Sequence, residues 1–317
     1  SMVLMIPIFS NIATAKEGQS SEQTYEQRMQ LYKEVDYPWH QLAAVDQYER
    51  NIQAVRNDIP KRDGLTAIQF SAEFWTGEFN PYQEDTAPTS IAYFGGYGID
   101  GNADGIANPY QDEDVIRSLA GYLNSFGMAD EDFEFALFSY YKSEEAVNQI
   151  QTIAQLYEKF NTLNLDKHYF PLPVKFNYSY RSTWGANRGW GGKRAHEGTD
   201  LFAGYGTQVY ATSYGIIETM GWNDFGGWRI GIRDHRNTYH YYAHLNSYDE
   251  NIKVGDIVEP GTLLGFVGSS GYGKEGTAGK FAPHLHYGMY KFNGRTEWAF
   301  DPYPSLQLWE RQTKGGN

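Results

Sequence analysis

The spacing of apolar residues changes near residue 165, and this change restricts the chain of 317 residues to a fold in two parts. Before the change, apolar side chains recur at intervals of three and four, which predicts helices with one buried face. Helices are also predicted over residues 114–126 and 144–160. One predicted helical face comprises Leu31, Val35, Trp39, Leu42 and Val45.

After the change the pattern is typical of a β-sheet. Residues 164–173 contain two prolines and are predicted to be the linker. Beyond them the apolar runs are short, rich in β-branched and aromatic residues, and separated by glycine, which predicts an antiparallel sheet. The predicted fold class is therefore α+β, with a helical domain at 20–165 and a β-sheet domain at 166–317. The predicted strands cover residues 209–212, 216–219, 228–233, 239–244 and 263–267.

The charge follows the same division. Residues 1–165 hold 10 Lys and Arg against 25 Asp and Glu, whereas residues 166–317 hold 16 against 14, so that the chain as a whole carries −13. A protein that binds nucleic acid needs a basic stripe to neutralise phosphates. We therefore exclude nucleic acid as a partner.

Residues 1–19 are interpreted as a truncated export signal. The run Met2–Phe9 is apolar, and residues 13–15 (Ala-Thr-Ala) are typical of a signal-peptide cleavage site. An uncleaved anchor is the alternative, although the run is shorter than the roughly 20 residues that span a bilayer. We expect an exported protein whose membrane contact is limited to this segment.

The chain has no cysteine, so any metal site must consist of histidine and carboxylate side chains. In a strand, residues two apart share one face, which places His284 beside His286 and points Leu285 into the core. His196 and Asp200 lie in a stretch rich in glycine, where a loop leading into a strand is favoured because each glycine costs a helix about 1 kcal/mol.

A third group of histidines lies on the predicted strand at 239–244. Regular alternation there puts His240, Tyr242 and His244 on one side, with His244 at the end of the strand. His196, Asp200 and one of the later histidines would make a three-ligand site with one position open for water, as in catalytic zinc sites. The alternative is a set of polar surface histidines.

The second half carries several motifs in a fixed order. It resembles the lysostaphin/LytM-type zinc metallopeptidases, which cut bacterial cell-wall peptides, over roughly residues 168–304. The resemblance implies a compact antiparallel β-sheet core, with Zn²⁺ held by His196, Asp200 and His286. It also implies His284 and His244 as catalytic imidazoles, one of them the general base. The motifs are H-x-x-x-D at 196–200, Y-A-H-L at 242–245, V-G-D-x-V-x-x-G at 254–261, G-F-V-G-S-S-G at 265–271 and P-H-L-H at 283–286.

From Tyr178 through Pro304 the likeness is closest to the LytH-like branch of spore-forming bacteria. That resemblance implies an L-alanyl-D-glutamate endopeptidase acting on stem peptides of spore-cortex peptidoglycan, in the cell wall or the forespore intermembrane space. A D-glutamate carboxylate needs a cation, and Arg229 and Arg233 are candidates on one strand face. A solvated strand face is the alternative for both arginines. Trp190 stands where some members of the family have a tyrosine.

Residues 37–51 resemble the entry helix of lysozyme-like lytic transglycosylases. The resemblance implies a lysozyme-like first domain with Glu49 as a glycosidic acid, although Arg50 follows where the family usually has serine. A lytic transglycosylase or muramidase acting on the glycan is therefore one alternative function. A metal-free cell-wall-binding scaffold is another.

Residues 100–111 carry oxygen-bearing side chains at alternate positions and a turn glycine, as a calcium loop does. The side chains are those of Asp100, Asn102, Asp104 and Asn108. Gln111 occupies the twelfth position, where a bidentate glutamate is expected, and the alternative is a turn whose side chains cap their own backbone. The remaining histidines are predicted to be structural or exposed, namely His40, His168, His235 and His240.

Overall fold

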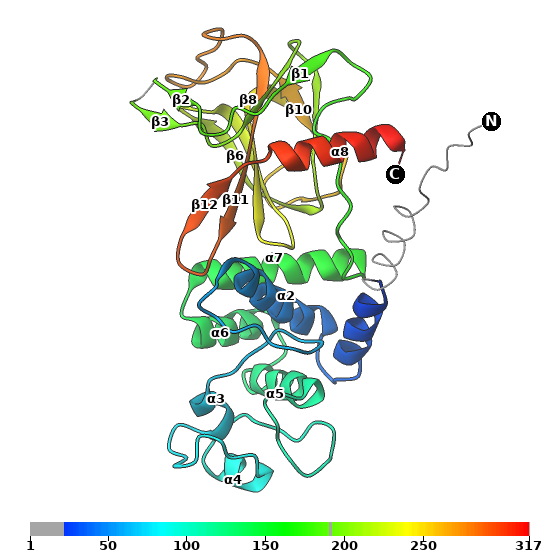
Figure 1. The fold of residues 1–317 in the computed structure, drawn as a ribbon, viewed down its shortest axis with the longest axis vertical. Helices are drawn as coiled ribbons and strands as arrows, with labels where there is room; N and C mark the ends of the chain where they lie inside the picture. Colours follow the sequence, from blue (N-terminus) through cyan, green and yellow to red (C-terminus); the bar gives the residue numbers. More distant parts are fainter. Residues whose placement is uncertain (1–21, 190–191, 317) are drawn as a thin grey trace, which may run out of the picture. The chain divides into compact units, whose positions relative to one another are not determined.

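A computed structural model describes residues 22–189 and 192–316 (Figure 1). Two compact units make up this part of the chain, and the main boundary between them falls between Asn164 and Leu165. Within the described ranges no helix combines the length and apolar character needed to cross a bilayer. The predicted export signal at 1–19 and Trp190 lie outside the described residues.

The first unit is helical. The helices predicted over 114–126 and 144–160 are confirmed as α5 (Asp112–Asn124) and α7 (Glu144–Phe160), each within about one turn of the predicted bounds. Ser143 caps α7, since its hydroxyl accepts a hydrogen bond from the backbone N–H of Ala146. Residues 22–33 are also helical, and the other helices are α2 (Trp39–Val55), α3 (Ala72–Thr76), α4 (Pro88–Tyr93), α5 (Asp112–Asn124), α6 (Asp130–Tyr141) and α7 (Glu144–Phe160).

The prediction of one continuous helical face from Leu31 to Val45 is wrong. The first helix ends at residue 33, and α2 starts only at Trp39. Pro38 stands between them, and a proline both lacks the N–H that a helix needs and clashes with the preceding turn. The chain therefore turns and restarts, although Leu31, Leu42 and Val45 are all buried.

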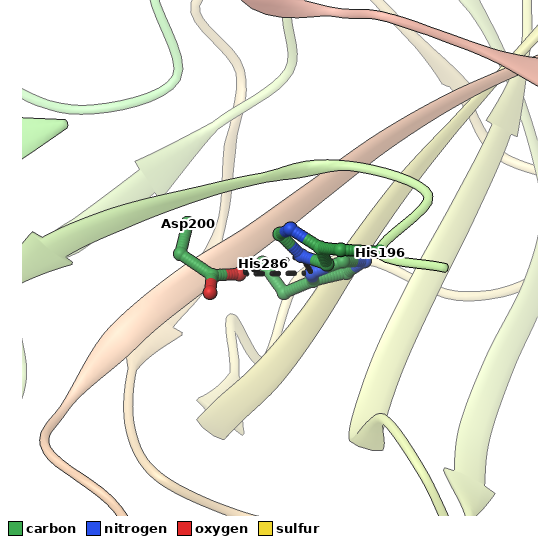
Figure 2. Close-up of side chains that lie close together, drawn as sticks. All are labelled: His196, Asp200 and His286. Atoms are coloured by element: carbon green, nitrogen blue, oxygen red, sulfur yellow. Dashed lines mark hydrogen bonds and ion pairs between the residues drawn. The ribbon is translucent and has the colours of Figure 1, made fainter. Parts of the chain in front are cut away.

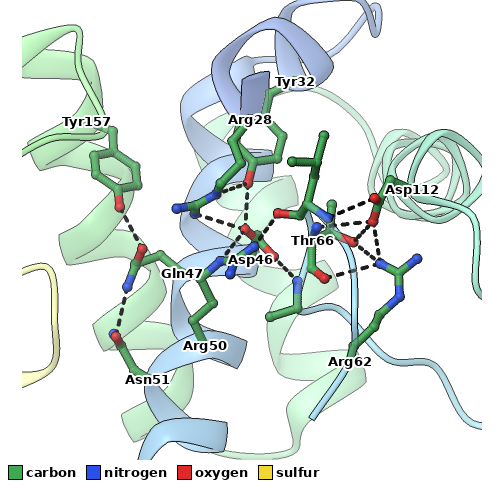
Figure 3. A network of polar contacts seen from close by, with 12 residues as sticks. Arg28, Tyr32, Asp46, Gln47, Arg50, Asn51, Arg62, Thr66, Asp112 and Tyr157 are labelled. Atoms are coloured by element: carbon green, nitrogen blue, oxygen red, sulfur yellow. Dashed lines mark hydrogen bonds and ion pairs between the residues drawn. The ribbon is translucent and has the colours of Figure 1, made fainter. Parts of the chain in front are cut away.

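A buried carboxylate ties the first helix to α2 (Figure 3). Asp46 accepts hydrogen bonds from Arg28 at 2.9 Å, from Tyr32 at 2.5 Å and from Arg50 at 3.0 Å. Burial would raise the pKa of Asp46, but the two guanidinium groups outweigh it and lower that pKa. Because the charges are paired and hydrogen-bonded, we interpret this network as structural.

The second unit is built on a 10-stranded antiparallel sheet whose main path runs β1-β4-β11-β8-β7-β6-β9. The antiparallel sheet is confirmed, and all five predicted strands are present. The strands are β1 (Tyr178–Tyr180), β4 (Thr199–Ala203), β5 (Gln208–Tyr210), β6 (Gly215–Asn223), β7 (Gly227–Arg233), β8 (Thr238–Tyr248), β9 (Ile257–Val258), β10 (Leu263–Val267), β11 (His284–Phe292) and β12 (Glu297–Phe300), with a separate hairpin of β2 (Asn187–Arg188) and β3 (Arg194–Ala195).

The core of this unit lies on one face of the sheet. Helix α8 (Tyr303–Gly315), red in Figure 1, contributes Leu306 and Trp309 to the same cluster as Leu285 of β11. Phe170 and Leu172 are also fully buried in it. The predicted linker at 164–173 is therefore wrong in its second part, because these two side chains are anchored in the β-sheet core.

Candidate metal centre

Two adjacent strands bring together the residues of a possible metal site. In the antiparallel pairing of β4 and β11, His286 lies opposite Asp200, and Leu285 lies opposite Leu201. Leu201 and Leu285 are completely buried in the core. Alternation along a strand then places Asp200 and His286 together on the other face, as the sequence predicted for His286.

His196 reaches this face from the loop between β3 and β4. Its Nδ1 lies 2.9 Å from the backbone oxygen of Thr183. A carbonyl oxygen only accepts, so Nδ1 carries the proton and Nε2 of the neutral ring presents a lone pair. The backbone of this loop passes close to the His286 ring at Gly198, where an added Cβ would lie 2.6 Å from His286 Cε1. A larger residue at 198 would displace the His286 ring.

Three donor atoms converge at this point (Figure 2). His196 Nε2 lies 2.9 Å from His286 Nδ1 and 3.1 Å from Asp200 Oδ1, and the last two atoms are 3.0 Å apart. Within the described part of the chain, these residues form the one group of three or more potential ligands that could share a metal ion.

The donor set fits a metal ion. Lone pairs of two imidazoles and a carboxylate repel one another at such distances unless a proton or a cation lies among them. Tetrahedral bonds of about 2.0–2.1 Å, as zinc forms with nitrogen and oxygen, place donor atoms roughly 3.3 Å apart. The observed separations need only a small expansion to reach that value, so this site could bind a metal.

The protonation states also suit metal binding. Burial would raise the pKa of Asp200, but the imidazoles of His196 and His286 beside its Oδ1 hold that pKa well below its usual range. Burial lowers the pKa of His286, and the neighbouring Asp200 only partly opposes this. The carboxylate is therefore ionised and the His286 imidazole neutral, which are the forms that coordinate metals. Arg188 donates to the second oxygen of Asp200 and fixes its orientation.

His244 enters the site through an irregularity of β8. Trp228 and Ile230 of β7 pair with Leu245 and Tyr242, so that β8 carries one extra residue there. His244 has a φ of 64°, and its N–H donates to the Gly226 oxygen at 2.7 Å. This bulge turns His244 to the face opposite Tyr242.

The prediction that His240, Tyr242 and His244 share one side is therefore wrong. His240 is buried in the core, where its Nε2 lies 3.0 Å from an oxygen of Asp234 and its Nδ1 lies 2.6 Å from the hydroxyl of Tyr287. These contacts leave His240 a structural residue.

The two predicted catalytic histidines are oriented in the same way. His244 Nδ1 donates to the Ser270 oxygen at 2.7 Å, and His284 Nδ1 donates to the Ala282 oxygen at 2.8 Å. Burial lowers the pKa of both imidazoles, that of His244 well below its ordinary value. Each neutral ring therefore keeps Nε2 free to accept a proton, and His284 Nε2 lies 3.7 Å from Asp200 Oδ1.

A cavity of ≈ 300 Å³ opens beside the three donor atoms. Arg229 and Arg233, the predicted binding arginines, are absent from its lining. Arg233 is buried and paired with Glu218 at 3.1 Å and with Glu297 at 2.8 Å, so its charge is neutralised within the protein. Sequence reasoning missed Arg188 and Arg194. The lining comprises Arg188, Arg194, His196, Glu197, Asp200, Asn223, Phe225, Gly226, Tyr239, Tyr241, His244, Tyr272, His286, Tyr290 and Glu297.

Glu49 lies in a different kind of cavity, inside the helical unit. Its carboxylate accepts a hydrogen bond from Tyr141 at 2.6 Å, among side chains that include Phe70, Leu119 and Leu137. The cavity holds only ≈ 10 Å³, about the volume of one water. A saccharide ring does not fit, so the structure gives no support to Glu49 as a glycosidic acid.

We expect Glu49 to make the helical unit less stable as pH rises. Burial raises the pKa of Glu49 to about 7, and the Tyr141 hydrogen bond only partly opposes this. The contribution of Glu49 to the free energy of unfolding is therefore fully present below its pKa in the unfolded chain. It is lost as the pH rises through its pKa in the folded protein. Because Glu49 is partly exposed, we expect the free energy of unfolding to fall by about 1–3 kcal/mol. The Glu49→Gln variant should lack this loss.

Thermal unfolding of both proteins between pH 5 and pH 8 measures the difference. Equal pH dependence in the wild type and the variant would contradict this role for Glu49. Peptide cleavage at pH 6 should be unchanged by the substitution.

The predicted calcium loop binds its own backbone instead. The two carboxylate oxygens of Asp100 accept from the N–H groups of Asp104 and Gly105, and Asn108 accepts from Tyr110. Asn102 accepts from the Asp104 N–H as well. The oxygens are thereby used within the turn, so the calcium prediction has no support and the capped-turn alternative fits better.

The chain is similar to known proteins over the segment that contains the three donor residues. The model of Peptidase family M23 matches residues 194–302. An L-Ala–D-Glu endopeptidase of Bacillus subtilis (strain 168) is 50% identical over 312 residues, which cover 97% of this chain and 96% of the relative. Lysostaphin of Staphylococcus simulans is 38% identical over 114 residues, covering 35% of this chain and 21% of lysostaphin.

One solved structure is similar to part of this chain. The catalytic domain of lysostaphin from Staphylococcus simulans shares 35% identity and covers 42% of this chain and 93% of its own, with a TM-score of 0.33. The identity to the Bacillus subtilis relative extends over nearly all of both chains. The chain belongs to peptidase family M23. The lysozyme-like character predicted for residues 20–165 stays a prediction.

Proposed function

We propose that the protein is a zinc-dependent peptidoglycan endopeptidase that hydrolyses the amide bond between L-Ala and D-Glu of the stem peptide. The observation that carries the proposal is the convergence of His196 Nε2, Asp200 Oδ1 and His286 Nδ1 within 3.1 Å. The relative that is 50% identical over 97% of the chain is named for this bond. Its name supports the choice of L-Ala–D-Glu.

His196, Asp200 and His286 would hold the zinc ion. When bound, zinc supplies Lewis-acid polarisation of a carbonyl group and lowers the pKa of a water molecule to about 7. The chain also fixes the orientation of two of these ligands. The backbone oxygen of Thr183 fixes the His196 tautomer, and Arg188 fixes the carboxylate of Asp200.

His244 and His284 would move the protons. The oxygen of water adds to the carbonyl carbon of L-Ala, the bond from that carbon to the nitrogen of D-Glu breaks, and a carboxylate and an amine result. One free Nε2 accepts the proton that water loses, and it returns a proton to the leaving nitrogen. The second imidazole takes up a proton from bulk water at Nε2, and in that form it donates a hydrogen bond to the oxyanion. The backbone bonds to Ser270 and Ala282 keep both rings in the orientation that this needs.

The substrate determines where such an enzyme would act. Peptidoglycan lies outside the cytoplasm, so we propose export to the cell wall or to the space around the forespore. Spore-cortex peptidoglycan is the proposed natural substrate, as the resemblance of residues 178–304 to the LytH-like branch of spore formers implies. Contact with both the stem peptide and its glycan is proposed at the cavity beside the donor atoms.

Digestion of purified peptidoglycan tests the proposal. Mass spectrometry should show fragments that end in L-Ala and complementary peptides that begin with D-Glu, with intact glycan strands. The purified protein should contain about one zinc per chain. Anhydro-muropeptides would instead point to a transglycosylase, and a stable protein without metal or cleavage would point to a binding scaffold. Either result would overturn the proposal.

A further inference from the structure

The hairpin of β2 and β3 presents an unusual pair of positive charges. Arg188 and Arg194 are direct cross-strand partners in this two-stranded sheet, and both line the cavity beside the candidate metal centre. Like charges placed directly opposite each other destabilise a β-ladder. Such a pair is tolerated where each positive charge is neutralised by an anion. Within the part of the chain that the structure describes, the protein supplies an anion to only one of the two arginines.

Arg188 has its anion within the protein, because it is bound to Asp200. Arg194 has none among the described residues. Its guanidinium lies 4.9 Å from the centre of the Phe225 ring, and its Nε is buried without a hydrogen-bond acceptor. A half-buried guanidinium with an unsatisfied Nε–H is costly on its own, and its remaining donors can bind a carboxylate.

The proposed substrate offers a carboxylate at the right side of the bond. Glutamate has two carboxyl groups and a peptide continues through only one, so the D-Glu on the amine side of the cleaved bond keeps the other free. Of the acidic side chains that line the cavity, Asp200 is paired with Arg188 and Glu297 is paired with Arg233. Among the described residues that line the cavity, Arg194 is therefore the cation left to neutralise the substrate carboxylate.

We propose that Arg194 binds the free carboxylate of the D-glutamyl residue and thereby selects the L-Ala–D-Glu bond. This inference rests on the proposed function. Arg188 is less suited because Asp200 occupies it, and Arg229 does not line the cavity. A guanidinium can hold a carboxylate through two parallel hydrogen bonds, which fixes its orientation as well as its position. Phe225 supports the flat face of the Arg194 group.

Two matched substrates test the proposal. One is a synthetic stem peptide whose D-Glu carboxyl is free, and the other is the same peptide with that carboxyl amidated. The wild type should prefer the free acid, and Arg194→Gln should lower kcat/KM on the free acid about 10- to 100-fold while changing the amidated substrate little. Arg194→Lys should keep part of the preference. Zinc content should be unchanged in both variants.

Arg295→Gln is the control, because Arg295 is exposed in the turn between β11 and β12 and does not line the cavity. It should keep the wild-type preference. The inference is overturned if the wild type cleaves both peptides equally, or if Arg194→Gln loses activity on both alike or keeps the full preference. If the wild type cleaves neither peptide, the proposed function itself fails. If Arg194→Gln does not fold, the preference of Arg194→Lys decides.

Discussion

His286→Ala is expected to abolish metal binding and peptide cleavage together, lowering kcat/KM on the order of 10⁴-fold or more. The substitution removes one of three donor atoms that lie within 3.1 Å of one another. His196 and Asp200 would remain, and two ligands do not hold a catalytic zinc firmly. Zinc content measured by mass spectrometry and cleavage of purified peptidoglycan give the two readouts.

His40→Ala serves as the control for His286→Ala. His40 lies in α2 of the helical unit and makes an edge-to-face contact with Trp39, so its loss should leave both zinc content and cleavage unchanged. A His286→Ala protein that kept stoichiometric zinc and full activity would remove the assignment of this residue as a ligand.

His284→Ala or His244→Ala should have a different effect, in which the metal stays and the chemistry is lost. Neither residue belongs to the group of three convergent donors. Each offers a free Nε2 beside that group, held in place by a backbone oxygen. General acid–base catalysis contributes about 10²- to 10⁴-fold, so we expect kcat to fall by that factor.

The matched measurements are zinc content, substrate affinity and kcat for each variant. Loss of zinc from His284→Ala would show that His284 is a ligand and not a proton carrier. Full activity in either variant would remove that imidazole from the mechanism. The double variant should lose less than the product of the single effects, because residues that act as a unit are not additive.

Much of the β-sheet unit could be predicted because its strands follow simple alternation. Leu285 and Leu201 face the core, and this fixes the direction of His286 and Asp200. His244 could not be placed in this way. Its direction depends on a bulge with a φ of 64°, and a single inserted residue leaves no trace in the pattern of apolar side chains.

The helical unit was harder to predict because some of its helices expose apolar side chains to solvent, which obscures the spacing of buried residues. Helix α6 was missed, and two of its aromatic side chains, Phe135 and Phe138, are 62% and 44% exposed. Exposed aromatic residues blur the apolar stripe that identifies a helix. Glu49 and the loop at Asp100 show a further limit, since a local motif does not reveal whether its oxygens face solvent or the protein's own donors.

The arginines of the β2–β3 hairpin were also missed. Each of the two strands has only two residues, which is too short for any periodicity to appear. Arg188 forms an ion pair with Asp200 of β4, and the Arg194 guanidinium contacts the ring of Phe225 in the turn between β6 and β7. Both contacts join residues that are separated in the sequence. A prediction from sequence alone could count these cations but could not place them beside the candidate metal centre.

Anomalous diffraction at the zinc edge, from crystals of the protein as purified, tests directly whether His196, Asp200 and His286 hold zinc. We expect one strong peak in the β-sheet unit, bonded to His196 Nε2, Asp200 Oδ1 and His286 Nδ1, with water as the fourth ligand. A peak bonded to other residues, a fourth protein ligand closing the site, or no peak in an active protein would contradict it.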